Sequence, residues 1–434
     1  TFGESVVKVI HLTPHLGGGV GRALSGLLQP SEHHVEHVFV CLEQAEKDHF
    51  IKLIIASGHQ VIVEPDEQQL KHLITEADIV QLEWWRHPKT ISALLKCCHL
   101  PMRLVVWCHV SGLYNEIIPE ALVEISSRFI MTSACTYQTE SIQSLLEVNN
   151  KKLAVIHSNN GLEHWPISAA CHPQKNLSVG YLGSFNFAKL HPDYIYYLAK
   201  VELTPFTVTM IGDDFNADTL MAQAKRLGRT DLLMFTGYIH DVAKSLDKIN
   251  VLAYLQNPRH YGTNENALLE AMAMGIVPVV LNNPAECEIV EHGKTGLVVN
   301  DQASFAEAIL WLHQHPQQRT EMGGNASAFV RDRHASGKMQ RAFDEQYNLA
   351  MQMQMQKQAI AFDNVFGETP AQWFLSCQQQ AELFKNDGFV ERPEDDFLRP
   401  SMMEETKGSA IHFHRYFPQD ELLAKWAGGV ASLC

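Results

Sequence analysis

The chain has 434 residues, of which 46% are hydrophobic and 19% are charged, values that are ordinary for a globular protein of two or three domains. Its formal net charge of −15 excludes a general nucleic-acid-binding surface, which has to be basic. A local basic groove for a phosphate ligand remains compatible with this charge.

No stretch reaches the roughly 18–20 apolar residues that a membrane-spanning helix needs, although peripheral contact with a membrane surface stays open. No basic-then-apolar segment opens the sequence, so we expect no secretion signal. The nine cysteines, including the adjacent Cys97 and Cys98, show the spacing of neither a zinc site nor a disulfide framework. We therefore expect a cytoplasmic protein.

The first third of the chain alternates strand-like and helix-like segments. An apolar run of strand length at residues 6–12, "VVKVIHL", turns into a helix within "GGGVGRALSGLL". Further short strands are expected at residues 37–42, 60–65, 78–85, 103–110, 128–134 and 152–161. Such alternation is typical of a parallel sheet with crossover helices.

After a loop at residues 166–176 the pattern starts again. The next expected strands are at residues 177–185, 206–215, 231–239, 249–257, 276–282 and 295–301. We therefore predict an α/β protein with two doubly wound, Rossmann-like halves that face across a cleft, the ligand lying at the carboxyl ends of the strands. The expected domains are residues 1–170, residues 171–340 and a C-terminal extension, residues 341–434.

The C-terminal extension differs in composition from the two halves. Residues 340–358 predict a helix, in which the alternation of Met and Gln is low in complexity. Residues 360–434 contain clustered aromatic residues and prolines without a motif. We expect them to pack on the two halves and favour this over an appendage that recognises an acceptor. His412 and His414 in "HFHR" could form a metal pair on a strand face, but without a third ligand we reject a metal site there.

The glycine run "HLGGGVGRAL" at residues 15–24 does not match the Gly-x-Gly-x-x-Gly dinucleotide fingerprint in either register. It predicts a turn after the first strand at which Gly18 and Gly19 let a ligand or a facing domain approach the backbone. A tight strand-to-helix turn without a ligand explains the run equally well.

The stretch "YGTNENALLEAMAMG" at residues 261–275 places a polar turn directly before an apolar helix. The backbone N–H groups of a helix start attract anions, so Thr263, Asn264, Asn266 and Ala267 are candidate contacts of a diphosphate. Two acids, Glu265 and Glu270, bracket the first helical turn. A capped core helix is the alternative.

Two further residues lie where strands end. His109 follows the buried run "VVWC" and could bind a substrate hydroxyl, although a histidine at a strand end is more often structural. Lys189 lies in the turn of "VGYLGSFNFAKLHPD", where its charge could meet a phosphate. Without further context a solvated surface lysine is the simpler interpretation.

A resemblance supplies that context. Residues 231–299, with the string "NALLEAMAMG…PVV…EIVEHGKTGLVV", resemble the family-4 retaining glycosyltransferases of the GT-B fold (glycosyl transferases group 1). Weaker similarities lie in the N-terminal glycine loop, in "VIHSNNGLEH" and in "LGSFNFAK". The resemblance covers about residues 6–340.

The resemblance implies roles for individual residues. Glu270 matches the second acid of the family's Glu-x7-Glu motif, which binds the ribose of the nucleotide. The first acid would stand at position 262, where this chain has Gly262, and Glu265 is its nearest substitute. Lys189 matches the diphosphate-binding lysine, whereas Ser184 replaces the partner arginine.

His109 matches the family's histidine beside the donor sugar. The implied catalytic residues are therefore His109, Lys189 and Glu265. The implied donor-binding residues are Gly18, Gly19, Ser184, Lys189, Thr263, Asn264, Asn266, Ala267 and Glu270.

The sequence therefore predicts an enzyme that transfers a sugar from a nucleotide-sugar to a hydroxyl of a glycan or a lipid-linked acceptor, with retention. The resemblance implies no metal and no cofactor, and polysaccharide or surface glycan synthesis is the expected setting. Two alternatives stay open: another GT-B-like enzyme, such as a sugar-nucleotide epimerase or a phosphorylase, and a non-catalytic nucleotide- or sugar-binding scaffold. The second is suggested by the departures at Gly262 and Ser184.

Overall fold

The computed structural model describes residues 6–28, 35–147, 151–158, 161–237, 241–357 and 365–433. The chain divides into two compact units. The first combines Thr1–Asn160 with Ser336–Cys434, and the second is Gly161–Ala335. The C-terminal extension therefore folds with the first unit.

The first unit is built on a seven-stranded parallel sheet with the order β3-β2-β1-β4-β6-β7-β8. This order reverses direction between β1 and β4, as in doubly wound folds. The strands are β1 (Val7–Thr13), β2 (Val35–Cys41), β3 (Gln60–Val63), β4 (Ile79–Trp84), β6 (Leu104–Cys108), β7 (Arg128–Met131) and β8 (Leu153–Val155).

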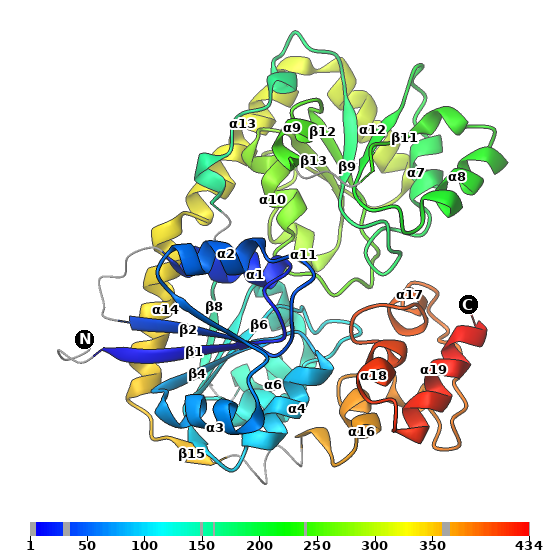
Figure 1. The fold of residues 1–434 in the computed structure, drawn as a ribbon. Coiled ribbons are helices and arrows are strands. Elements are labelled where there is room, and N and C mark those ends of the chain that lie inside the picture. Colours follow the sequence, from blue (N-terminus) through cyan, green and yellow to red (C-terminus); the bar gives the residue numbers. More distant parts are fainter. Residues whose placement is uncertain are drawn as a thin grey trace. The chain divides into compact units, whose positions relative to one another are not determined.

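Helices cover both faces of this sheet (Figure 1). The α-helices are α1 (Gly19–Ser25), α2 (His49–Ala56), α3 (Glu67–Glu76), α4 (Pro88–Cys97), α5 (Glu120–Ile125), α6 (Glu140–Glu147) and α14 (Ser336–Met351). Short 3-10 helices are η1 (Gly26–Leu28) and η2 (Ala134–Gln138). Every residue of β4 and β6 is buried, which explains their almost continuous apolar sequence.

The second unit has a six-stranded parallel sheet with the order β11-β10-β9-β12-β13-β14. Its strands are β9 (Val179–Leu182), β10 (Val208–Ile211), β11 (Leu233–Phe235), β12 (Val251–Tyr254), β13 (Val277–Leu281) and β14 (Leu297–Val299). Its α-helices are α7 (Tyr194–Ala199), α8 (Ala217–Arg226), α9 (Val242–Leu246), α10 (Asn266–Ala273), α11 (Pro284–Cys287), α12 (Gln302–Gln314) and α13 (Pro316–Arg333). Its 3-10 helices are η3 (Leu162–His164), η4 (Ala169–Cys171) and η5 (Thr230–Leu232). The predicted α/β architecture with two Rossmann-like halves is confirmed.

The C-terminal extension begins within α14, whose residues Phe343 and Tyr347 pack into the core of the first unit. A compact group of helices follows, drawn in orange and red in Figure 1. These are α16 (Pro370–Leu375), η6 (Ala381–Leu383), α17 (Arg399–Met403), α18 (Ala410–Tyr416) and α19 (Glu421–Leu433). Both α16 and α18 contact α4, so the group is attached to the first unit.

One prediction about the extension was wrong. The helix expected over residues 340–358 ends at Met351, and β15 (Gln356–Lys357) pairs antiparallel with β5 (Pro101–Met102). Strand pairing thus overrides the helical propensity of the Met/Gln segment, whose last residue, 358, lies outside the described residues. His412 and His414 lie on α18 and not on a strand face.

The strands expected at residues 152–161 and 231–239 are each three residues long, at Leu153–Val155 and Leu233–Phe235. Residues 159–160 and 238–239 of these two expected strands lie outside the described residues.

Two adjacent glycines of α13 give opposite predictions. A Cβ at Gly323 would lie 2.0 Å from the carbonyl oxygen of Gly275, whereas a Cβ at Gly324 would meet nothing within 4 Å. We expect Gly323→Ala to lower the free energy of unfolding by about 1–3 kcal/mol through overpacking. Gly324→Ala should raise it by about 0.5–1 kcal/mol, because alanine favours a helix over glycine. Urea denaturation measures both, and equal effects would contradict the packing of α13.

Candidate functional site

The predicted donor-binding residues of the second unit gather where neighbouring strands end. The turn after β9 carries Ser184 and Lys189, and the loop after β12 leads to Glu265, the residue before α10. Since β9 and β12 pair in parallel, their carboxyl ends lie at the same edge of the sheet. This topology explains why residues that are 76 positions apart come into contact.

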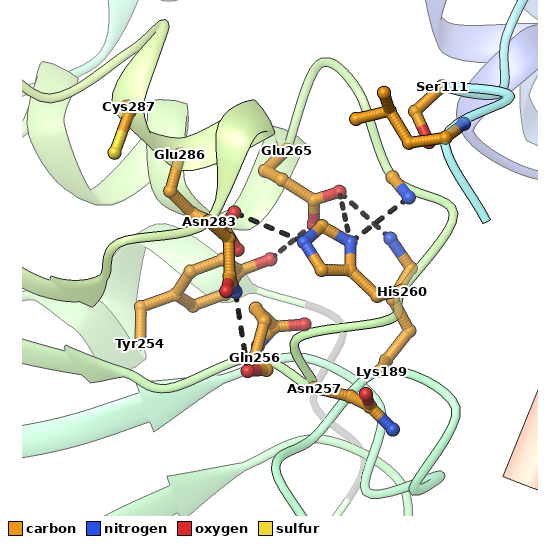
Figure 2. Close-up of polar contacts among 12 residues, drawn as sticks. Ser111, Lys189, Tyr254, Gln256, Asn257, His260, Glu265, Asn283, Glu286 and Cys287 are labelled. Atoms are coloured by element: carbon orange, nitrogen blue, oxygen red, sulfur yellow. Dashed lines mark hydrogen bonds and ion pairs between the residues drawn. The ribbon is translucent and has the colours of Figure 1, made fainter. Parts of the chain in front are cut away.

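Lys189 and Glu265 form an ion pair, with 2.8 Å between Nζ and Oε1. The other carboxylate oxygen accepts a hydrogen bond of 2.6 Å from the Tyr254 hydroxyl (Figure 2). The Lys189 ammonium also lies 4.6 Å from the ring centroid of Tyr261. The Glu265 side chain is 7% exposed and that of Lys189 is 21% exposed, so the lysine is the partner that can still reach a ligand.

The pair is electrostatically stable. Burial raises the pKa of Glu265, but the charge of Lys189, the nearby His260 and two hydrogen bonds outweigh burial and hold this pKa well below its usual value. Burial lowers the pKa of Lys189, and the charge of Glu265 together with Tyr261 more than offsets this, so the lysine pKa is raised. Both side chains are therefore charged at neutral pH.

His260 links this pair to a second buried acid, Glu286. The backbone N–H of Gly262 donates to His260 Nδ1 at 3.0 Å, which places the proton of the neutral ring on Nε2. That nitrogen lies 3.1 Å from Glu286 Oε2, and Glu286 is fully buried (Figure 2). His260 and Glu286 thus fix the loop that precedes α10.

Gly262 leaves the space that the Glu265 carboxylate occupies. A Cβ at position 262 would lie 1.6 Å from Glu265 Oε1 and 2.5 Å from Lys189 Nζ. Glycine is needed here because a side chain has no room. The backbone does not require it, since φ of Gly262 is not positive. The carboxylate of Glu265 fills the place where a side chain of residue 262 would begin.

The remaining predicted residues of the second unit surround the start of α10. Thr263 is buried, and Asn264, Asn266 and Ala267 are half-buried. Glu270 follows one turn along the helix and is 4% exposed. Ser184 is exposed, and its hydroxyl accepts a hydrogen bond from the backbone N–H of Asn186.

Gly18, Gly19 and His109 belong to the first unit. Gly18 precedes α1, and a Cβ there would meet nothing within 4 Å, whereas one at Gly21 would lie 2.1 Å from the carbonyl oxygen of Leu16. Gly19 is the exposed first residue of α1. The room at Gly18 fits the predicted close approach of a ligand, and Gly21 serves packing.

His109 directly follows β6 and is held by a buried acid. Its Nε2 lies 2.7 Å from Oε2 of Glu83, which is fully buried in β4. The other oxygen, Oε1, accepts a hydrogen bond of 2.8 Å from the Gln81 side chain, and His11 Nδ1 lies 3.4 Å away. Burial raises the pKa of Glu83, but hydrogen bonds to His109 and His11 outweigh it and lower the pKa.

Sequence reasoning missed Glu83, Tyr254, His260 and Glu286. A signal for Glu83 was present, because Gln81 and Glu83 interrupt an otherwise apolar strand, "DIVQLEWW". A buried polar group needs partners, so such an interruption indicates a network. His260 and Glu286 lie in loops or short helices, where no periodicity marks them.

Within the described residues, no group of three or more His, Cys, Asp or Glu side chains could hold a metal ion. Over the same ranges, no helix is both long and apolar enough to cross a bilayer.

Solved structures define the class of protein. HepE of Anabaena in complex with UDP superimposes with a TM-score of 0.62 at 17% identity, covering 79% of this chain and 100% of that chain. Sucrose-phosphate synthase of Thermosynechococcus elongatus gives a TM-score of 0.58 at 15% identity, with 79% and 98% coverage. The fold is therefore that of the GT-B glycosyltransferases.

Sequence comparison then defines the family. Residues 177–315 match the family model described as glycosyl transferases group 1. The D-rhamnosyltransferase WbpZ of Pseudomonas aeruginosa is 31% identical over 288 residues, which is 61% of this chain and 71% of that protein. The chain belongs to the group 1 glycosyltransferase family.

The Lys189–Glu265 pair predicts a pH-dependent stability. We expect Glu265→Gln to lower the free energy of unfolding at pH 7 by about 1–3 kcal/mol, because it removes a charged hydrogen-bond partner of Lys189. Since the folded pKa of Glu265 is depressed, this difference should be complete above the ordinary value of 4.5 and shrink as the pH falls below it. Urea denaturation of both proteins across this range measures it.

A matched control is Glu291→Gln. Glu291 is 58% exposed and pairs with Lys294 at 2.9 Å, so its loss should change stability by no more than about 0.5 kcal/mol. A Glu265→Gln variant as stable as this control at pH 7 would contradict the buried ion pair.

Proposed function

We propose that this glycosyltransferase transfers a sugar from a nucleotide-sugar to a hydroxyl of a glycan or lipid-linked acceptor, with retention of the anomeric configuration. One observation carries the proposal: Lys189, the start of α10 and Glu270 share one edge of the second sheet. HepE, which has the same fold, was solved with UDP, and WbpZ is named a D-rhamnosyltransferase. Both support a nucleotide-sugar as the donor.

The donor is proposed to bind with its diphosphate at the start of α10. The first N–H groups of a helix have no partner inside the helix and carry its positive dipole end, so they suit an anion. An ammonium group has several N–H donors, and Glu265 occupies one of those of Lys189. The others would donate to the diphosphate. Glu270, one turn further, would accept hydrogen bonds from the ribose.

Transfer is proposed to depend on electrostatic stabilisation of the leaving group. When the bond between the sugar and the diphosphate breaks, the sugar becomes oxocarbenium-like and negative charge grows on the diphosphate. Donors that are held in place before the reaction stabilise this charge without reorganisation. Lys189 meets this condition because its ion pair and the Tyr261 ring fix its position.

Glu265 is proposed to act as a positioning residue. Both of its oxygens are in hydrogen bonds and the side chain is almost fully buried, which leaves little of it to contact a sugar. It also neutralises part of the charge of Lys189. This weakens the attraction of the site for phosphate and lets the helix dipole contribute a larger share.

His109 is proposed to contact the sugar, with Glu83 as its positioning residue. Glu83 accepts the Nε2 proton, so in the neutral ring Nδ1 is the hydrogen-bond acceptor. An acceptor nitrogen at the end of a strand suits a sugar hydroxyl. The burial of Glu83 makes this orientation rigid.

The setting of the reaction is part of the proposal. The family resemblance supports a reaction without metal or cofactor and a place in polysaccharide or surface glycan synthesis. Every described cysteine is a free thiol, which fits a reducing compartment such as the cytoplasm.

A non-catalytic scaffold is the second candidate, because Gly262 and Ser184 replace a carboxylate and an arginine, and Glu265 partly neutralises Lys189. A thermal-shift panel of nucleoside diphosphates and nucleotide-sugars finds the donor, since a ligand of the native state raises its apparent stability. Incubation of that donor with and without glycan acceptors then separates the candidates. Transfer to an acceptor supports the enzyme; binding without any turnover supports the scaffold, and interconversion of the donor without acceptor supports an epimerase.

Glu270→Ala should weaken binding of the preferred nucleoside diphosphate by about 1.5–3 kcal/mol, the range for loss of a hydrogen bond to a charged group. Isothermal titration calorimetry measures it. Glu307→Ala, at an exposed position of α12, is the control and should bind normally. Unchanged affinity in a folded Glu270→Ala variant would remove Glu270 from the nucleotide site.

His109→Ala should leave nucleoside diphosphate affinity unchanged and lower kcat by tenfold or more, which corresponds to about 1.4 kcal/mol of transition-state stabilisation. Glu83→Gln should lower kcat in the same direction, because a neutral amide oxygen accepts the Nε2 proton more weakly than a carboxylate and so orients the ring less firmly. His72→Ala, on exposed α3, is the control. If His109→Ala transferred sugar at the wild-type rate, the histidine would be structural.

A further inference from the structure

The first unit contains a cavity of about 490 Å³ that none of the proposed roles above uses. It lies beyond the ends of β1, β2 and β4, where His15, Glu43 and Trp85 follow the strands. The C-terminal extension supplies the opposite wall with Lys407, His412 and Tyr416. Its volume falls within the range of about 300–1,000 Å³ that is typical of small-ligand sites.

The two walls are joined by Glu43. Its Oε2 accepts a hydrogen bond of 2.7 Å from the Tyr416 hydroxyl, and its Oε1 lies 3.4 Å from His87 Nε2. The Glu43 side chain is 16% exposed, so part of the carboxylate still faces the cavity. The extension is thus a wall of the cavity that is tied to the sheet by a specific polar contact.

Aromatic side chains line both walls. The Trp85 ring is half-buried, with His15 5.5 Å away in an edge-on arrangement and the Lys407 ammonium 5.1 Å from the ring centroid. Tyr416 packs edge-on against His412 with ring centroids 5.2 Å apart. Flat apolar faces beside polar groups suit a ligand that itself has apolar C–H faces and hydroxyl edges.

The charges of the lining balance. The carboxylates of Glu43, Glu46 and Glu405 stand against the cations of Lys47, Lys407 and Arg415, and Arg415 is paired with Glu405. Burial lowers the pKa of His15 to about 4 and that of His412 to about 3, so neither adds positive charge at neutral pH. A lining without excess positive charge does not select a phosphate or a nucleotide.

We propose that this cavity binds a neutral saccharide unit of the acceptor, and that the C-terminal extension therefore sets part of the acceptor specificity. The inference rests on the proposed function. The Glu43 carboxylate and the neutral imidazoles accept and donate hydrogen bonds to hydroxyl groups, and Trp85 and Tyr416 offer their ring faces. The cavity is a binding site, separate from the residues assigned to the donor.

Saturation-transfer NMR with methyl glycosides of neutral hexoses and 6-deoxyhexoses tests this inference on the full-length chain. We expect at least one glycoside to bind the wild type. Glu43→Gln should weaken binding of that glycoside by about tenfold, the loss expected for a hydrogen bond to a charged group. Tyr416→Phe should also weaken it, because the Tyr416 hydroxyl holds the Glu43 carboxylate in place. Glu36→Gln, an exposed acid at the other end of β2, is the matched control and should leave the affinity unchanged.

Thermal melting of each variant shows whether it is folded. If Glu43→Gln fails to fold, Tyr416→Phe still tests the inference, because it keeps the aromatic ring. The inference is overturned if no glycoside binds, or if the bound glycoside is indifferent to both substitutions. Calorimetry with nucleoside diphosphates on the same samples tests the proposed function independently. If the wild type binds a nucleotide but no glycoside, only the inference about the cavity is contradicted. If the wild type binds no nucleotide, the proposed function is contradicted.

Discussion

The ion pair between Lys189 and Glu265 is the interaction on which the second unit's candidate site depends. It joins the turn after β9 to the residue before α10, and Tyr254 at the end of β12 completes it. Three segments that are distant in sequence are thereby held at one edge of the sheet. Gly262 makes the arrangement sterically feasible, because any larger side chain there would displace the Glu265 carboxylate.

The two units show the same principle of construction. In each, a parallel sheet brings its strand ends to one edge, and a buried acid there holds a basic side chain by a short hydrogen bond. Glu83 holds His109 in the first unit, as Glu265 holds Lys189 in the second. A buried acid of this kind restricts the rotamers of its partner, and rigid positioning is what preorganised catalysis needs.

Much of the fold was predictable from the sequence, because apolar runs of strand length alternate with helical segments in both halves. The positions of Lys189 and Glu265 were also found, but their contact was not, since side-chain pairing across 76 residues has no periodic signal. The role of Gly262 could not be predicted for a related reason: sequence shows which side chain is missing, and only coordinates show which group fills the space. The Met/Gln segment leaves the helix after Met351 and forms β15, which pairs with β5, a non-local contact that local propensity does not contain.

A crystal structure of the complex with the nucleoside diphosphate that binds most tightly in calorimetry tests the central claim most directly. The account predicts that a diphosphate oxygen lies within hydrogen-bonding distance of Lys189 Nζ, that the phosphates face the start of α10, and that the ribose hydroxyls contact Glu270. A nucleotide bound away from α10, or one that leaves Lys189 in contact with Glu265 and Tyr261 alone, would contradict it.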